Sequence, residues 1–311
     1  MYFPYLRGRQ NELLAIRELL DRECIRNGII PVIEPVKLSS TLIKTMEYFI
    51  DRGQPLTIIH NPKVGTFTDD LKQLVESPLK DSYTKLMTND KIIKGHILNR
   101  NSSGELTNLQ AEGIKRADVL MICEDRDMLD SYGQEINDNP AKYHFIPDES
   151  AFKRKLRTNR VLLDDKFTKQ IRNVDYIKSD DEFFSEDHLY YREEGYVGFS
   201  DYSIVGKPYS ESGFAPFAIA IHIVYFDSSY NLRIKHFVSD SNEDLNDPAG
   251  KFYEAITKLY KWYEMSNIKT YGLDRLVRHF EAGTYPGLGI VKKLSIMHHL
   301  ELVSQYLDGV R

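Results

Sequence analysis

The chain has 311 residues, of which 41% are hydrophobic and 28% are charged, and its formal net charge is −5. This composition is typical of a globular protein with a large core and excludes a disordered or collagen-like chain. The charge does not indicate a general nucleic-acid binder, and two cysteines, Cys24 and Cys123, are too few for a disulfide framework or a cysteine-rich zinc site.

Targeting and membrane segments are not evident in the sequence. The first ten residues, MYFPYLRGRQ, lack the long apolar stretch of a signal peptide. No stretch approaches the roughly 20 consecutive apolar residues that a transmembrane helix needs. We therefore expect a cytoplasmic protein that does not associate with membranes.

Short apolar stretches alternate with helical patterns over the first two thirds of the chain. The predicted strands are residues 29–36, 56–62, 91–100, 118–125, 142–150, 159–167 and 195–206. The predicted helices are residues 11–24, 39–53, 67–78, 108–117, 126–137 and 151–157. This alternation is typical of βα units around a parallel sheet. The number of units, and the absence of a glycine-rich turn after the first strand, favour a TIM-barrel-like α/β barrel over an open nucleotide-binding sheet.

The pattern changes in the last third of the chain. Residues 214–227 and 232–240 are β-rich and flank a turn-forming segment, which predicts an antiparallel hairpin. Three helical patterns follow, at residues 248–266, 271–283 and 288–307. We predict one barrel-like domain over residues 1–311, with regular βα units in 1–212 and, in 213–311, a hairpin and C-terminal helices that close the barrel. The acidic stretch 177–195 is interpreted as a solvated loop and helix, with a functional lid as the alternative.

Polar residues follow nearly every predicted strand. In parallel α/β barrels the reactive groups lie at the C-terminal ends of the strands, where the βα loops converge. The residues at these ends are Glu34, His60, Asn61, Asn99, Arg100, Glu124, Asp125, Asp148, Glu149, Asp164, Asp165 and Asp201. Carboxylates grouped with a histidine and an arginine suit a hard cation such as Mg²⁺, or general acid–base catalysis.

From this set we select candidates for two roles. The catalytic candidates are Glu34, Asn61, Asp165 and Asp201, and the binding candidates are His60, Arg100 and Lys207. The metal is left open, with Mg²⁺ as one option. Ordinary helix capping is the alternative interpretation, above all for Asp125, Asp148 and Asp164. A turn-forming Asn-Pro pair equally explains Asn61, which precedes Pro62.

The N-terminal stretch YFPYLRGRQNELLAI, together with IIPVIEP at residues 29–35, resembles the beta protein family of phages and bacteria. It is similar, more closely, to a family of uncharacterised bacterial proteins often encoded beside a second small protein. The match covers roughly residues 1–65 and depends on Tyr2 or Tyr5 with Pro4, Arg7 or Arg9, Glu12 and Pro31–Glu34. The resemblance implies a barrel-like α/β fold, a partner protein from an adjacent gene, and a role in antiphage defence or mobile elements. It assigns no catalytic residue.

Two classes of function remain open. The first is an enzyme or receptor that hydrolyses or binds a phosphate-containing or nucleotide-like ligand at the barrel mouth. The second is a non-catalytic module that senses a phage product or holds a partner protein through exposed aromatics such as Tyr190, Tyr191 and Tyr209. Binding of nucleic acid through the basic residues of 153–172 is a third, weaker interpretation.

Overall fold

The computed structural model describes residues 1–26, 28–73, 76–132, 140–211 and 216–309. Its contacts group the chain into two compact units. The first unit comprises Met1–Leu13, Asn27–Asp164 and Tyr190–Asp201, and the second comprises Leu14–Arg26, Asp165–Leu189 and Tyr202–Arg311. The sequence had predicted one domain over residues 1–311. Because the chain crosses between the units several times, no single linker could mark a boundary.

The first unit is an eight-stranded parallel sheet in the order β1-β2-β3-β4-β5-β6-β7-β9. Its strands are β1 (Tyr5–Leu6), β2 (Val32–Ile33), β3 (Leu56–Ile59), β4 (Ile92–Ile97), β5 (Val119–Ile122), β6 (Tyr143–Ile146), β7 (Arg160–Asp164) and β9 (Gly198–Asp201). The N-terminal strand also joins the last one: Phe3 N–H donates to the Phe199 carbonyl at 2.9 Å, and Phe199 N–H to the Met1 carbonyl at 3.1 Å. The sheet is therefore a nearly closed barrel, and the predicted TIM-barrel-like fold is confirmed.

The hydrogen bonds that close the sheet come from residues 1–3, not from the C-terminal helices to which the sequence analysis assigned this role. The strand that follows these residues, β1, was not predicted. It is two residues long and lies between Pro4 and Gly8, so it is too short to show the alternation by which a strand is recognised.

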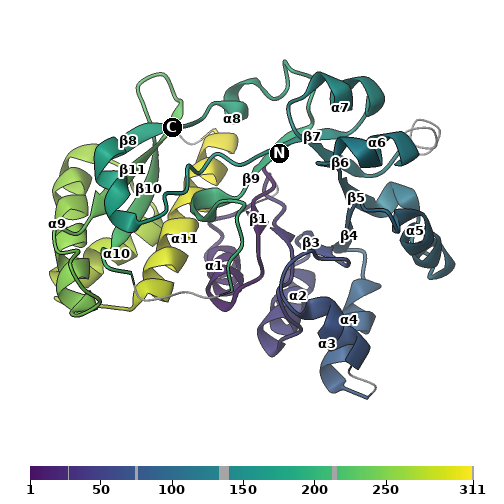
Figure 1. Ribbon diagram of the computed structural model, residues 1–311, viewed down its shortest axis with the longest axis horizontal. Coiled ribbons are helices and arrows are strands. Elements are labelled where there is room, and N and C mark those ends of the chain that lie inside the picture. Colours follow the sequence, from purple (N-terminus) through teal and green to yellow (C-terminus); the bar gives the residue numbers. More distant parts are fainter. Residues whose placement is uncertain (27, 74–75, 133–139, 212–215, 310–311) are drawn as a thin grey trace. The chain divides into compact units, whose positions relative to one another are not determined.

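Helices surround the barrel on its outside (Figure 1). They are α2 (Ser40–Asp51), α3 (Phe67–Gln73), α4 (Pro78–Met87), α5 (Ser102–Ala111), α6 (Arg126–Tyr132) and α7 (Ser150–Lys155), with a 3₁₀ turn η1 (Arg116–Asp118) before β5. Helix α1 (Gln10–Asp21) begins in the first unit and ends in the second. The predicted helix 108–117 was wrong at both ends: α5 begins at Ser102 and ends before Gly113, whose φ of +86° disfavours any other residue. Helix α4 was not predicted.

Aromatic side chains fill the barrel lumen. In β6, His144 packs against Tyr132 of α6, with ring centroids 6.4 Å apart, so this residue faces the helices. Its neighbours in the strand, Tyr143 and Phe145, face the opposite way. Phe3 contacts both of their rings, at 4.9 and 5.3 Å. These contacts identify the lumen side of each strand.

The second unit is built on an antiparallel sheet in the order β10-β11-β8. Strands β10 (Ala220–Phe226) and β11 (Leu232–Val238) form the predicted hairpin, whereas β8 (Asp181–Ser185) lies in the acidic stretch that was interpreted as loop and helix. The helical elements are η2 (Asn173–Ser179), α8 (Asp187–Tyr190), η3 (Ser203–Val205), α9 (Pro248–Ser266), α10 (Tyr271–Glu281) and α11 (Leu288–Leu307). The three predicted C-terminal helices are confirmed.

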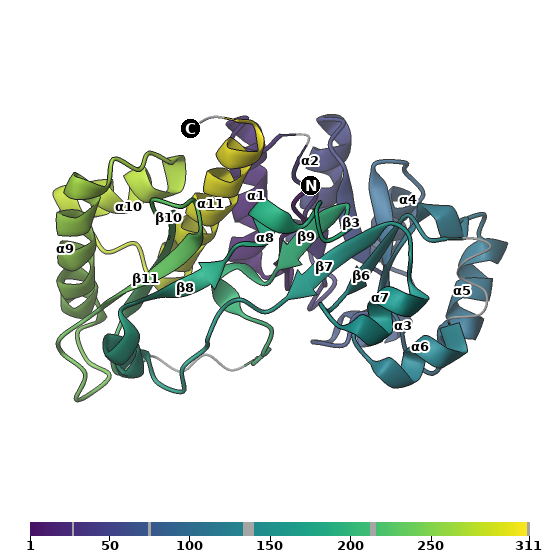
Figure 2. The ribbon, with the colours of Figure 1, turned by 90° about the horizontal axis from the view of Figure 1, so that it is seen from above.

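Helices α9 and α11 cover opposite faces of this sheet (Figure 2). Trp262 of α9 packs against Tyr225, with ring centroids 5.4 Å apart. Tyr306 of α11 packs against the next residue, Phe226, at 5.2 Å. Because successive residues of a strand point to opposite faces, the two contacts show that the sheet is buried on both sides.

A substitution pair tests the packing of the lumen. A Cβ atom at Gly198 would lie 2.6 Å from the Phe3 ring and 2.7 Å from the Met1 carbonyl oxygen. Overpacking costs about 1–3 kcal/mol, so we expect Gly198→Ala to lower the free energy of unfolding by about 2 kcal/mol. Gly104→Ala is the control, because Gly104 lies in α5 with open space around it, and alanine there should add up to about 1 kcal/mol. Urea denaturation followed by circular dichroism measures both, and equal midpoints would contradict the packing described.

Candidate functional site

The carboxylate of Glu34 points into the C-terminal mouth of the barrel. In β4, His96 bonds to Ser102 of α5 and so faces the helices, which places Ile93 on the lumen side. Ile93 stands in register, through β3, with Val32 of β2. Glu34 follows two residues after Val32 and faces the same way. It is 1% exposed.

Three donors hold this carboxylate. The Tyr5 hydroxyl donates to Oε2 at 2.8 Å, and the Arg7 guanidinium forms an ion pair with the same oxygen. The backbone N–H of Lys63 donates to Oε1 at 2.8 Å. Arg7 is itself 8% exposed, and its backbone N–H donates to Glu12 at 2.7 Å. The mouth therefore holds a buried, charge-compensated cluster, which we call the mouth cluster: Tyr5, Arg7, Glu12, Glu34 and Lys63.

The loop between β3 and α3 is fixed against the end of β2. Thr66 N–H donates to the Val36 carbonyl at 2.7 Å. Gly65 lies so close that a Cβ atom there would be 2.1 Å from the same carbonyl oxygen, and its φ is +73°. Only glycine fits this approach. The loop is thereby held where Lys63 can donate to Glu34.

A second polar cluster lies on the outer side of β3 and β4. Nε2 of His60 is 2.8 Å from Nδ1 of His96, and Nε2 of His96 is 2.8 Å from Oγ of Ser102. Burial, reinforced by the neighbouring His60, lowers the pKa of His96 to about 3. Burial also lowers the pKa of His60. The Oγ atom of Ser102 also accepts the backbone N–H of Asn99 at 2.8 Å.

The amide of Asn61 joins two strands. Its Nδ2 donates to the Ile97 carbonyl and to Glu105, both at 2.9 Å, and its Oδ1 accepts the Ile97 N–H at 2.8 Å. These bonds extend the pairing of β3 and β4 beyond their ends. The contacts of this predicted catalytic residue are those of a positioning group.

Asp201 faces away from the lumen. A Cβ atom on Gly198 would point at the Phe3 ring, so Gly198 and Ser200 face inward and Asp201 faces outward. Its carboxylate accepts the Tyr2 hydroxyl at 2.8 Å. Burial, and then the charge of Asp201, raises the pKa of Tyr2 well above its ordinary value. Glu34 and Asp201 are thus on opposite sides of the barrel wall.

The other predicted site residues fall into separate places. Asp165 and Lys207 belong to the second unit, where the Asp165 carboxylate accepts the Lys207 backbone N–H at 2.8 Å. Arg100 is exposed on the turn after β4. Asp125 accepts the Asp127 N–H at 2.9 Å at the start of α6, as the capping interpretation predicts. The structure thus joins Glu34 to Tyr5, Arg7, Glu12 and Lys63, to which the sequence gave no catalytic role.

Sequence reasoning singled out Tyr5, Arg7 and Glu12 only through the family resemblance. The spacing of Tyr5 and Arg7 places them on one side of a strand, but a strand had not been predicted there. Recognition of β1 would have aligned both side chains with the mouth.

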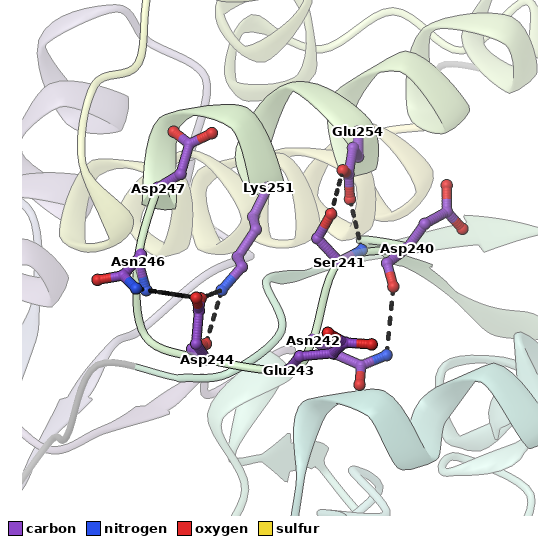
Figure 3. Close-up of a pocket in the computed structure, with 9 residues that line it drawn as sticks. All are labelled: Asp240, Ser241, Asn242, Glu243, Asp244, Asn246, Asp247, Lys251 and Glu254. Carbon is purple, nitrogen blue, oxygen red and sulfur yellow. Dashed lines mark hydrogen bonds and ion pairs between the residues drawn. The ribbon is translucent and has the colours of Figure 1, made fainter.

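Acidic side chains also gather outside the barrel, in the second unit. Around the loop from Asp240 to Asp247 and the first turns of α9, a hollow of about 610 Å³ is lined largely by carboxylates (Figure 3). Glu254 accepts the Ser241 N–H at 2.8 Å, and Asp244 accepts the Lys251 ammonium at 3.2 Å. Their hydrogen bonds shape the loop before α9. Among the residues that the structure describes, no three His, Cys, Asp or Glu side chains are grouped to hold a metal ion.

Two further expectations can be compared with the structure. In the basic segment 153–172, Lys166 pairs with Asp187 at 2.9 Å and Arg172 with Asp175 at 2.9 Å, so much of its charge is compensated. Tyr191 was expected to be exposed but is buried, and its hydroxyl accepts the N-terminal ammonium at 3.0 Å. No helix in the described part of the chain is both long and apolar enough to cross a bilayer.

Comparisons with protein-family models, with curated proteins and with solved structures find no match to this chain.

The mouth cluster makes a prediction about stability. Removal of one member of a buried ion pair leaves the other charge uncompensated and costs about 3–5 kcal/mol. We therefore expect Glu34→Gln to lower the free energy of unfolding by about 3 kcal/mol. The double variant Arg7→Met/Glu34→Gln should lose less than the sum of the single variants, with a coupling of about 1–3 kcal/mol. Urea denaturation measures the cycle, and additive losses would show that Arg7 and Glu34 act independently.

Proposed function

We propose that the protein binds a phosphate-containing or nucleotide-like ligand at the barrel mouth and hydrolyses it there, as a component of a bacterial antiphage or mobile-element-linked system. The observation that carries this proposal is the buried Arg7–Glu34 pair at the C-terminal end of the lumen. In barrels of this kind, this end is where active sites lie. A buried ion pair contributes little net stability, so its presence at this position favours a role beyond folding.

The chemistry of the pair suits a phosphate. A guanidinium presents its N–H donors as a fork that matches phosphate oxygens. A ligand phosphate that competes with Glu34 for Arg7 would release the carboxylate to accept a proton from an attacking water. The Lys63 N–H and the Tyr5 hydroxyl then keep the carboxylate oriented. The water oxygen attacks phosphorus, the phosphoester bond breaks, and the leaving oxygen takes up the proton that Glu34 accepted, which returns Glu34 to its ionised form.

The link to antiphage systems depends on the family resemblance. The resemblance depends on Tyr2 or Tyr5, on Arg7 or Arg9, and on Glu12 and Glu34. One member of each of these alternatives, Tyr5 and Arg7, lies in the mouth cluster with Glu12 and Glu34. Their convergence supports a shared use of the barrel mouth, because a motif required only for packing need not group its polar members around one carboxylate.

Ligand-dependent stabilisation tests this proposal. A ligand that binds only the folded state adds about 2.7 kcal/mol at a hundredfold excess over its Kd. We expect ATP, GTP or inorganic phosphate, each with and without Mg²⁺, to raise the melting temperature of the wild-type chain. The double variant Arg7→Met/Glu34→Gln should lose this shift and any release of phosphate. Asp201→Asn should keep both, since Asp201 faces the outside of the barrel.

The control is informative because Asp201 is as buried as Glu34 and also accepts a tyrosine hydroxyl. Equal loss of the shift in both variants would point to a general loss of structure. A shift that survives in the double variant would remove the mouth cluster from the proposed function.

A hollow in the second unit favours a second candidate function, recognition of a partner protein encoded by an adjacent gene. The hollow has a volume of about 380 Å³ and includes Trp262 and Phe237 among its lining residues. Two apolar residues at its edge are unusually exposed, Ile177 by 51% and Met265 by 75%. Exposed apolar and aromatic residues around a hollow are typical of the centre of a protein interface.

Charge substitution at the hollow tests the second candidate. We expect Met265→Glu to weaken binding of the purified adjacent-gene protein at least about tenfold, as for an interface hot spot. Leu245→Glu is the matched control, because Leu245 is also half exposed but does not line the hollow. Isothermal titration calorimetry measures both. Equal affinities of the Met265→Glu variant and the wild type would contradict this use of the hollow.

A further inference from the structure

A large groove lies on the outside of the barrel over β4. It has a volume of about 1160 Å³ and is lined by residues of α4, β4 and α5. The two helices lie on either side of β4 in Figure 1. Helix α5 buries only two large apolar side chains, Leu106 and Leu109, so it covers little of the strand beside it. The groove belongs to the first unit throughout, and its lining residues include no member of the mouth cluster.

Much of the groove surface is apolar. Met87 of α4, Ile92 of β4, and Leu109 and Ile114 on the α5 side all line it. A volume of this size exceeds that of many pockets for small organic ligands. The groove can therefore take a ligand with a substantial apolar body.

On the outer face of the barrel, β4 carries a charged residue. The residues beside it on the neighbouring strands are apolar. The register places five residues side by side in a row that faces the helices: Leu6, Ile33, Ile58, Lys94 and Val119. Lys94 lines the groove and is 7% exposed. A lysine in such a row is unfavourable for packing, because burial of an ammonium is costly unless it is paired.

Within the described residues, the Lys94 ammonium has no hydrogen-bond or ion-pair partner. Another buried lysine, Lys251, donates to Asp244 at 3.2 Å. Burial lowers the pKa of Lys94, while the charges of Asp118 and Asp90 raise it and that of Lys142 lowers it. The strand thus presents to the groove a buried ammonium from which no described residue accepts a hydrogen bond.

A second donor lies in the wall of the groove. The Tyr83 hydroxyl of α4 is buried and has no hydrogen-bond partner in the part of the chain that the structure describes. Burial, and then the charge of Glu112, raises the pKa of Tyr83, so the hydroxyl keeps its proton. The Lys94 ammonium is a donor, so an occupant that pairs with it would have to accept.

We propose that this groove binds an amphipathic monoanion, whose acidic group pairs with Lys94 and whose apolar body covers Met87, Ile92 and Leu109. The lining residues also include four carboxylates, Asp90, Glu105, Glu112 and Asp118, against Lys94 and Lys142. This negative excess disfavours polyanions such as nucleotides, which would meet several like charges at short range. A single carboxylate, sulfonate or phosphodiester group on an apolar body fits.

Two fluorescent probes with nearly the same apolar body test this assignment. The sulfonate 8-anilinonaphthalene-1-sulfonate carries one negative charge, and N-phenyl-1-naphthylamine carries none. We expect the wild-type chain to bind the sulfonate about tenfold or more tightly than the neutral probe, as for a hydrogen-bonded charge pair. Lys94→Met should remove this preference and leave the affinity for the neutral probe unchanged. Lys85→Met, an exposed residue of α4 outside the groove, should behave as the wild type.

A variant that fills the groove shows whether the probes bind there or elsewhere on the protein. Thr84 is an exposed residue that lines the groove, so Thr84→Trp should reduce the affinity for both probes. The variant Arg7→Met/Glu34→Gln should bind both as the wild type does, which separates this site from the proposed function. Equal binding of the two probes to the wild type, or unchanged sulfonate binding in Lys94→Met or Thr84→Trp, would overturn the proposal.

Discussion

The pairing of the N-terminal strand with β9 is the interaction on which the barrel and its mouth both depend. The backbone hydrogen bonds of Phe199 with Phe3 and with Met1 complete the sheet. The same strand continues two residues later into Tyr5 and then Arg7, which face the mouth and hold Glu34. Without this strand the Glu34 carboxylate would be a buried charge without a cation, which costs several kcal/mol. The same N-terminal segment therefore completes the sheet and supplies the cation that compensates the charge of Glu34.

Charged side chains at the mouth and on the outer side of the barrel strands lie in different environments. At the mouth, the carboxylate of Glu34 is satisfied by a cation, a hydroxyl and a backbone N–H. On the outer side of β4, Lys94 lies in a row of apolar residues, with only more distant carboxylates to offset its charge. A barrel wall one strand thick keeps these environments apart.

Much of the fold could be predicted because its periodicity is local. The βα alternation, the hairpin and the last three helices follow from patterns within short windows of sequence. The strands β1 and β8 could not, because one has two residues and the other lies in an acidic stretch, and each pairs with a strand distant in sequence. Glu34 was correctly expected at a strand end near the mouth, but Asp201, at another strand end, faces outward. A shift of one residue in the alternation reverses the side to which a side chain points.

The sequence by itself determined that this chain forms a parallel α/β barrel with polar residues at its strand ends, since hydrophobic period and turn chemistry are properties of neighbouring residues. Only the tertiary structure decided which polar residues meet. It joined Arg7 to Glu34 across 27 positions and left Lys94 facing a groove between two helices. The physical reason is that the contacts of a side chain in a barrel depend on strand register and on which strands are neighbours. Both are set by pairing between segments that are distant along the chain.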